Sequence, residues 1–139
     1  MRLIRTRVWV CLCSLAWIGC QGQYAGPVSG KVVIDGRPAP GILVEFVPLK
    51  DGPKSHGETD AKGQFVLIPA NGQRILFGRH KVVLQDLSGI EKFLGTAGDG
   101  KDASQGKKSR LDPAYSALSQ TPLIREVSPG DSFFPFEIP

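Results

Sequence analysis

Few side chains in this 139-residue chain could act as nucleophiles or metal ligands. The sequence has three cysteines and two histidines, His56 and His80. Cys11 and Cys13 lie inside an apolar run, and the set of further Cys or His residues that zinc requires is missing around them. No serine follows the pattern of a strand-turn-helix elbow that would expose it as a nucleophile. We therefore expect no catalytic residue, no resident metal and no cofactor.

The amino terminus has the layout of a secretory signal. Three arginines precede Val8, and the segment from Val8 to Ile18 carries no charge. A membrane-spanning helix needs about 20 apolar residues, and the polar residues from Gln21 onward end this run well short of that length. We predict that residues 1–19 are a signal peptide.

The junction WIGC, which ends at Cys20, resembles the lipobox of bacterial lipoproteins. In that family a small residue precedes a cysteine whose sulfur is acylated before the signal is cleaved on its amino side. Gly19 and Cys20 match these two positions, and Trp17 stands where the family usually has Leu. Ordinary signal cleavage, the alternative, needs small residues at both flanking sites. The resemblance implies cleavage between Gly19 and Cys20, lipid on Cys20, and a protein anchored to the extracytoplasmic (periplasmic or cell-surface) face of a bacterial membrane.

The charge balance argues against a nucleic-acid partner. The chain has 17 basic and 13 acidic residues, but three of the basic residues belong to the predicted signal. The remaining charges nearly cancel, whereas nucleic-acid binding requires a clustered basic face. Lys107, Lys108 and Arg110 form one short basic run, which we interpret as a solvated stretch of a long loop, with contact to anionic lipid or polysaccharide as the alternative.

Beyond the signal, apolar residues recur with the period of two that is typical of β-strands. Asp35-Gly36 predicts a tight turn between strands, and Thr59–Leu67 predicts a hairpin with Phe65 and Leu67 facing the core. The pattern predicts further strands at residues 28–34, 42–47, 78–85, 123–127 and 133–138.

The carboxy-terminal segments predict a final hairpin. Leu123–Val127 and Phe133–Ile138 would be its strands, and the residues SPGD would form its turn. In the second strand, alternation places Phe134, Phe136 and Ile138 on one face and Phe133 on the other. An exposed Phe133 could belong to a binding surface. Pro135 further indicates an edge strand, because proline lacks the amide that a neighbouring strand would need.

These elements predict an all-β fold, an antiparallel two-sheet sandwich of about seven strands. We expect residues 20–27 to be a tether and residues 28–139 to be the sandwich domain. Residues 86–110 would form a long flexible loop within that domain, because their composition cannot bury enough apolar surface to order them.

The sequence from Val28 to Leu84 resembles the carboxypeptidase regulatory-like, or transthyretin-like, module. The shared features are an opening GKV strand, a DGRP turn, a VEF strand, the TDAKGQF hairpin and the strand GRHKVVL. The tail LDPAYSALSQTPLIREVSPGDSFFPFEIP further resembles the ending of short bacterial lipoproteins built on this module. The resemblance implies a small transthyretin-like sandwich outside the cytoplasm, usually an accessory, adhesive or structural part.

We therefore expect a non-catalytic, lipid-anchored envelope protein with a binding or structural role. Its partners would be the membrane, reached through Cys20, and an envelope protein or polysaccharide. A carbohydrate- or peptide-binding module is one alternative. Another is a small metal-dependent enzyme, because some enzymes with a related sandwich hold iron through two Tyr and two His. Outside the predicted signal this chain has two of each: Tyr24, His56, His80 and Tyr115.

Overall fold

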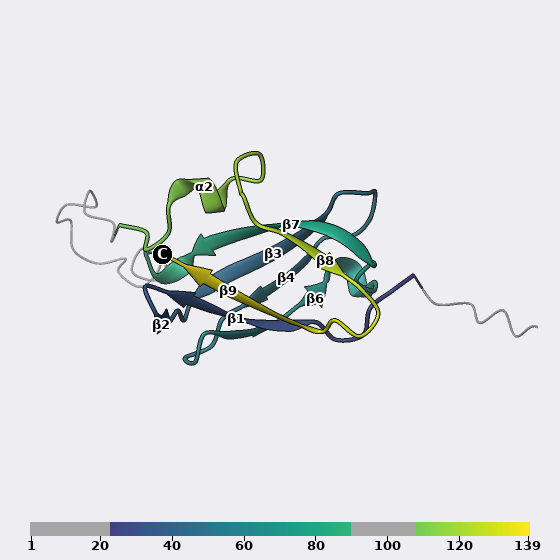
Figure 1. The fold of residues 1–139 in the computed structure, drawn as a ribbon, viewed down its shortest axis with the longest axis horizontal. Coiled ribbons are helices and arrows are strands. Elements are labelled where there is room, and N and C mark those ends of the chain that lie inside the picture. Colours follow the sequence, from purple (N-terminus) through teal and green to yellow (C-terminus); the bar gives the residue numbers. More distant parts are fainter. Residues whose placement is uncertain (1–22, 90–107) are drawn as a thin grey trace, which may run out of the picture.

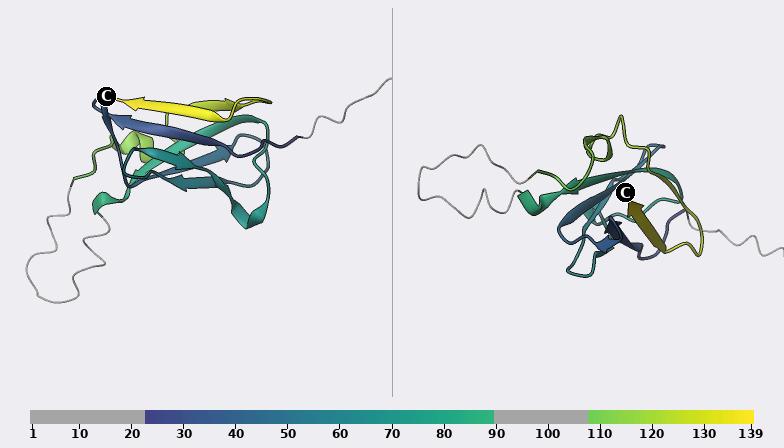
Figure 2. Two further views of the ribbon diagram at one scale, coloured as in Figure 1. Left: turned by 90° about the horizontal axis from the view of Figure 1, so that it is seen from below. Right: turned by 60° about the vertical axis from the view of Figure 1, so that its left-hand side comes forward.

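The protein is an all-β sandwich of two facing sheets (Figures 1 and 2). The computed structural model describes residues 23–89 and 108–139. Strands form most of the regular structure there, and the single helix of the described residues, α2, is one turn long. The strands are β1 (Ser29–Ile34), β2 (Arg37–Pro38), β3 (Ile42–Pro48), β4 (Ser55–Glu58), β5 (Gln64–Val66), β6 (Ile68–Pro69), β7 (Gly78–Asp86), β8 (Ile124–Val127) and β9 (Phe133–Ile138). The remaining elements are the 3₁₀ turns η1 (Ala70–Gly72) and η2 (Leu87–Gly89) and the helix α2 (Pro113–Ser116).

The two sheets differ in their number of strands and in their central strand. In the β1 sheet, β9 lies on one side of β1, while β5 and β2 pair with different parts of its other side. The β3 sheet has the order β6-β4-β3-β7-β8. All these pairs are antiparallel except β1 with β9, which is parallel. The predicted two-sheet sandwich is confirmed, with nine strands among the described residues rather than about seven.

The inward side chains of both sheets form one core. The strands β1, β3 and β9 alternate buried and more exposed residues, as a sheet with one face on the core requires. Phe46 of β3 meets Phe134 and Phe136 of β9 edge to face, with ring centroids 5.7 Å and 6.2 Å apart. Phe65 and Leu67 are buried at 2% and 4% exposure, so their predicted inward orientation is confirmed.

The turns follow the predicted chemistry. Asp35 and Gly36 join β1 to β2 and both have positive φ, 49° and 73°, as a two-residue hairpin turn of this kind needs. In the next turn, Asp60 Oδ1 accepts hydrogen bonds from the amides of Lys62 and Gln64, so the predicted turn is present. The predicted hairpin is wrong, because the flanking strands β4 and β5 pair in different sheets and this turn carries the chain across the sandwich. The hydroxyl of Thr59 donates to the Ala39 carbonyl and accepts from the Ile42 amide, which ties this turn to the start of β3.

The predicted final hairpin is wrong. β8 pairs with β7 in one sheet, whereas β9 pairs with β1 in the other, so the turn between them carries the chain across the sandwich. The physical reason is that Phe134 and Phe136 are buried at 7% and 1% exposure in the parallel position beside β1. Arg125 of β8 lies over the Phe136 ring at 4.8 Å and covers the edge where the two sheets meet.

The two ends of the sandwich carry different segments. The folded unit begins at Gln23, because the Phe77 amide donates to the Gln23 carbonyl and the Ala25 amide donates to the Ile75 carbonyl. Ordered pairing therefore starts inside the stretch expected as a tether. We call this the N-terminal end, and the opposite end, which holds Asp86 and the carboxy terminus, the C-terminal end (Figure 1).

Candidate binding site

A shallow hollow of about 410 Å³ lies on the outer face of the β1 sheet. Two of its lining side chains are exposed and apolar, Val66 at 58% and Phe133 at 54% exposure. The hollow is lined by Ser29, Gly30, Glu58, Asp60, Gln64, Phe65, Val66 and Phe133.

Strand pairing fixes the spacing of the apolar pair. Val66 of β5 and Phe133 of β9 both stand opposite Ser29 of β1, so the three residues form one row across the sheet. Neighbouring strands lie about 4.8 Å apart, which places Val66 and Phe133 roughly 10 Å apart on either side of a small hydroxyl. The predicted outward orientation of Phe133 is confirmed, and its neighbours Phe134, Phe136 and Ile138 face the core.

Polar groups lie on the β4 and β5 side of the hollow. Glu58 is exposed at the end of β4, and the Gln64 side chain is exposed at the start of β5. Asp60 uses one carboxylate oxygen to hold its turn. The site can therefore offer an aromatic face, an aliphatic surface, carboxylate acceptors and an amide to one ligand.

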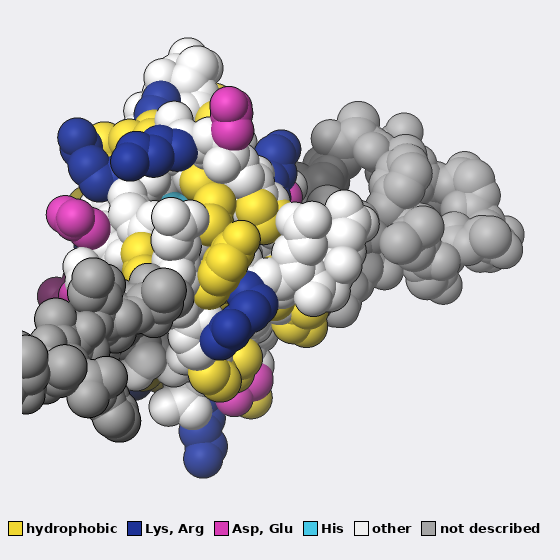
Figure 3. Space-filling model, turned by 90° about the vertical axis from the view of Figure 1, so that its right-hand side faces the viewer, with side chains coloured by type: hydrophobic (Ala, Val, Ile, Leu, Met, Phe, Trp, Pro, Cys, Tyr) yellow, Lys and Arg dark blue, Asp and Glu magenta, His cyan; other side chains and the backbone are white. Residues whose placement is uncertain are grey.

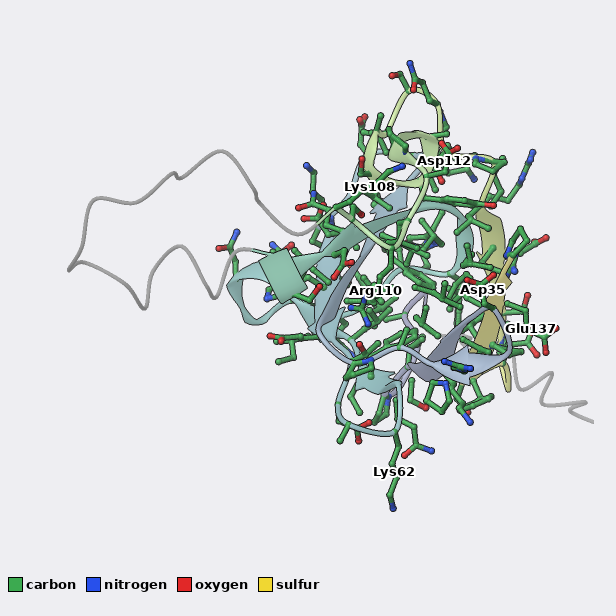
Figure 4. All side chains as sticks on the ribbon, turned by 90° about the vertical axis from the view of Figure 1, so that its left-hand side faces the viewer. Asp35, Lys62, Lys108, Arg110, Asp112 and Glu137 are labelled. Carbon is green, nitrogen blue, oxygen red and sulfur yellow. The ribbon has the colours of Figure 1, made fainter. Side chains whose placement is uncertain are left out.

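A second hollow, of about 550 Å³, lies at the C-terminal end and is lined by Ile34, Asp35, Arg37, Pro38, Ala39 and Arg110. Figure 4 views this end, where Arg110 lies close to the body of the domain and Asp35 and Lys62 lie nearer the rim. The Arg110 side chain already forms hydrogen bonds within the protein. Its Nε and Nη2 donate to the Asp86 carboxylate at 2.9 Å and 2.8 Å, and Nη2 also donates to the Pro40 carbonyl.

The Asp86–Arg110 pair closes the base of the expected long loop. The Asp86 side chain is 1% exposed and accepts two further hydrogen bonds, from the amides of Ser88 and Arg110. The Arg110 guanidinium holds the pKa of the Asp86 carboxyl well below its usual range, although burial acts in the opposite direction. Arg110 is thus part of an ion pair rather than of a solvated run. Lys107 and most of the expected loop, residues 90–107, lie outside the described residues.

The residues of the iron hypothesis do not converge. His80 lies on the inner face of β7, where it is 1% exposed and packs 5.9 Å from the Phe46 ring. His80 is therefore a core side chain, packed against the Phe46 ring. His56 lies on β4 with its exposed side chain on the outer face of the same sheet.

The surroundings of His80 suit a neutral imidazole. Burial lowers its pKa, and a hydrogen bond with the Gly78 carbonyl, 2.9 Å from Nδ1, opposes that effect. Tyr24 lies at the N-terminal end and Tyr115 in α2. No group of three or more His, Cys, Asp or Glu side chains comes together as a metal site within residues 23–89 and 108–139.

The comparisons with known proteins give no match. No family model matches the chain, and neither a curated protein nor a solved structure is significantly similar to it. Function is therefore inferred from the fold and the two hollows.

The predicted lipidation and cleavage residues, Gly19 and Cys20, lie outside the described residues. Within the described part of the chain, no helix has the length and apolar character needed to cross a membrane.

Sequence reasoning identified Phe133 but missed the side chains that surround it. The outward orientation of Val66 follows from the predicted inward pair Phe65 and Leu67, so its exposure could have been inferred. The proximity of Val66 to Phe133 could not, because it depends on β1 pairing with both β5 and β9.

Proposed function

We propose that this protein is a lipid-anchored, non-catalytic binding module of the bacterial cell envelope, of carboxypeptidase regulatory-like type. Its sandwich would recognise a carbohydrate in the hollow beside Phe133. The single observation that carries this proposal is the combination, in one hollow, of an exposed aromatic ring with carboxylate and amide side chains.

This combination suits a sugar better than a purely apolar ligand. A sugar ring presents C–H groups on its faces and hydroxyl groups around its rim. The negative face of an aromatic ring attracts such C–H groups, and Phe133 leaves more than half of its surface free for this contact. Glu58 and the second oxygen of Asp60 can accept hydrogen bonds from hydroxyls, and such charge-assisted bonds are stronger than neutral ones.

The geometry of β9 disfavours a peptide that would add a strand to the β1 sheet. The Ser29 and Asp35 amides donate to the carbonyls of Ser132 and Ile138, so the even-numbered residues of β9 bond to β1. The odd-numbered residues, Phe133, Pro135 and Glu137, then direct their backbone groups toward the free edge. Pro135 has no amide, so the middle of this edge cannot donate to an added strand.

The anchoring part of the proposal rests on the junction of Gly19 and Cys20. It would place the domain outside the cytoplasm, where envelope polysaccharides are accessible. Mass spectrometry of the protein purified from bacterial membranes tests it directly. The expected amino-terminal residue is Cys20 carrying fatty acyl chains, and an intact, unacylated amino terminus would contradict this part.

A glycan array with the purified protein tests the binding part. We expect saturable binding to at least one class of envelope polysaccharide and a loss of about tenfold or more in affinity for Phe133→Ala, equivalent to about 1.4 kcal/mol. Leu118→Ala is the matched control, because Leu118 is 42% exposed and lies outside the hollow. Equal binding by both variants would refute the role of the hollow, and saturable binding to peptides alone would favour the peptide alternative.

A further inference from the structure

The N-terminal end of the sandwich has an exposed apolar centre. Tyr24 and Leu49 are 44% and 48% exposed there, and the half-buried Leu76 pairs with Tyr24. The Arg74 guanidinium lies 5.9 Å from the centre of the Tyr24 ring. Figure 3 shows this end of the molecule, with hydrophobic side chains gathered in the middle and both Lys or Arg and Asp or Glu side chains spaced around them.

The charges of this end sum to a small positive value. The loops and strand ends that form it are residues 23–27, 48–54, 70–79 and 128–132. They contain four basic residues, Lys50, Lys54, Arg74 and Arg79, and two acidic residues, Asp51 and Asp131. Glu126 of β8 stands opposite Arg79 and is a third acidic group at this end, which leaves a net charge of +1. A mixed apolar and basic surface is typical of proteins that lie on anionic membranes, where each Lys or Arg near the surface contributes about 1 kcal/mol.

The position of Cys20 brings this surface close to any bilayer that holds the lipid. Only Gln21 and Gly22 separate Cys20 from Gln23, where ordered pairing begins. An extended chain covers at most about 3.6 Å per residue, so Gln23 lies within roughly 11 Å of Cys20. That distance is comparable to the Debye length of about 8 Å at physiological salt, so the bilayer charge would be only partly screened where the folded unit begins.

We propose that the N-terminal end of the sandwich docks on the surface of an anionic phospholipid bilayer. Tyr24 and Leu49 enter the headgroup region, and Lys50, Lys54, Arg74 and Arg79 contact lipid phosphates. This inference rests on the proposed lipidation of Cys20 and adds to it a fixed orientation of the domain. The long axis then stands away from the membrane, and the C-terminal end faces the envelope space.

Fluorescence quenching in vesicles tests this orientation. The acylated full-length protein is reconstituted with phosphatidylglycerol, phosphatidylethanolamine and a lipid that carries a quencher on its headgroup. Cys20 is the one cysteine outside the predicted signal, and in this proposal its thiol carries lipid. Gln73→Cys and Ala61→Cys therefore each introduce one site for a fluorescent label. Both positions are exposed turn residues, Gln73 at the N-terminal end and Ala61 at the C-terminal end.

We expect strong quenching of the label at position 73 and only background quenching at position 61, because the seven residues of β3 alone separate the two ends by about 20 Å. Replacing Lys50 and Lys54 by Gln should lower the ratio of docked to undocked protein about fivefold for each charge, which corresponds to about 1 kcal/mol. The matched control replaces Lys31 and Lys62, which lie elsewhere, and should change little.

The outcomes separate docking from anchoring. Protein that floats with the vesicles but shows equal quenching at both positions, or none at either, would overturn docking and leave the lipid anchor intact. Protein that neither floats nor carries the acyl mass would overturn the anchor and the docking that rests on it.

Discussion

The stability of this domain should depend strongly on the ion pair between Asp86 and Arg110. The Asp86 carboxylate is 1% exposed and accepts four hydrogen bonds, two of them from the Arg110 side chain. Arg110→Met keeps much of the aliphatic stem but removes the guanidinium. Asp86 would then remain buried with its two backbone donors alone.

The structure sets the size of the expected loss. Removing one partner of a buried pair typically costs about 3–5 kcal/mol. The Arg110 side chain is 29% exposed and the two backbone bonds to Asp86 survive, so we expect the lower end, a loss of about 3 kcal/mol in the free energy of unfolding. Asp86→Asn should cost a similar amount, because its amide group would face donors. The double variant should lose much less than the sum of the single losses, since the partners share one interaction.

Chemical denaturation followed by circular dichroism measures these losses, because the two tryptophans of the chain lie in the predicted signal. Arg37→Met is the matched control: Arg37 is exposed and lines the same hollow, so its replacement should change stability by no more than about 0.5 kcal/mol. A loss for Arg110→Met as small as that of the control would refute the reasoning.

The same pair predicts a response to acid. The folded pKa of Asp86 lies below its ordinary value of 3.8, so the unfolded chain binds a proton first as the pH falls. The stabilisation is complete above about pH 4 and is lost as the pH falls below that value. Asp86→Asn should remove this part of the acid sensitivity, which parallel denaturation curves at pH 5 and pH 3 would measure. An unchanged pH dependence in the variant would contradict the assignment.

Three further predictions follow from other residues. The pKa of His80 is lowered in the folded state, so stability should fall as the pH drops below about 6.5. His80→Phe should weaken that dependence in denaturation curves, and an unchanged dependence would contradict this. Gly30→Ala should lower the free energy of unfolding by about 1–3 kcal/mol, because a Cβ would overlap the Phe134 carbonyl and the Phe65 ring; calorimetry showing full stability would contradict this. Cys20→Ala should move the protein from the membrane fraction to the soluble fraction in immunoblots, and retention in the membrane would argue against the lipid anchor.

Local patterns in the sequence sufficed to predict most of the strands. The period-of-two alternation located β1, β3 and β7 to within one residue of their observed bounds. The Asp35-Gly36 and Thr59–Leu67 turns were also predictable, because their geometry depends on backbone conformation and hydrogen bonds within a few residues.

The pairing of strands far apart in the chain was harder to predict from the sequence. The parallel pairing of β9 with β1 joins residues more than one hundred positions apart, as in Ser29 with Phe133. A short turn between two strands favours a hairpin, and that local preference led to the wrong prediction for the tail. The burial of Phe134 and Phe136 against the core outweighs it. The Asp86–Arg110 pair escaped prediction for the same reason, since the charges lie at opposite ends of a long segment.

The residues that carry the resemblance to carboxypeptidase regulatory-like modules have structural tasks in this fold. Gly30 allows β9 to approach, and Thr59 bridges two segments through its hydroxyl. These residues therefore support the sandwich, and under the proposed function ligand choice would depend on surface residues such as Phe133 and Val66. A saturation library scored for folding and for glycan binding should separate the two sets. Substitutions of Gly30 and Thr59 should lower both scores, whereas polar substitutions of Phe133 should lower binding alone, because its ring is more than half exposed and contributes little to the core.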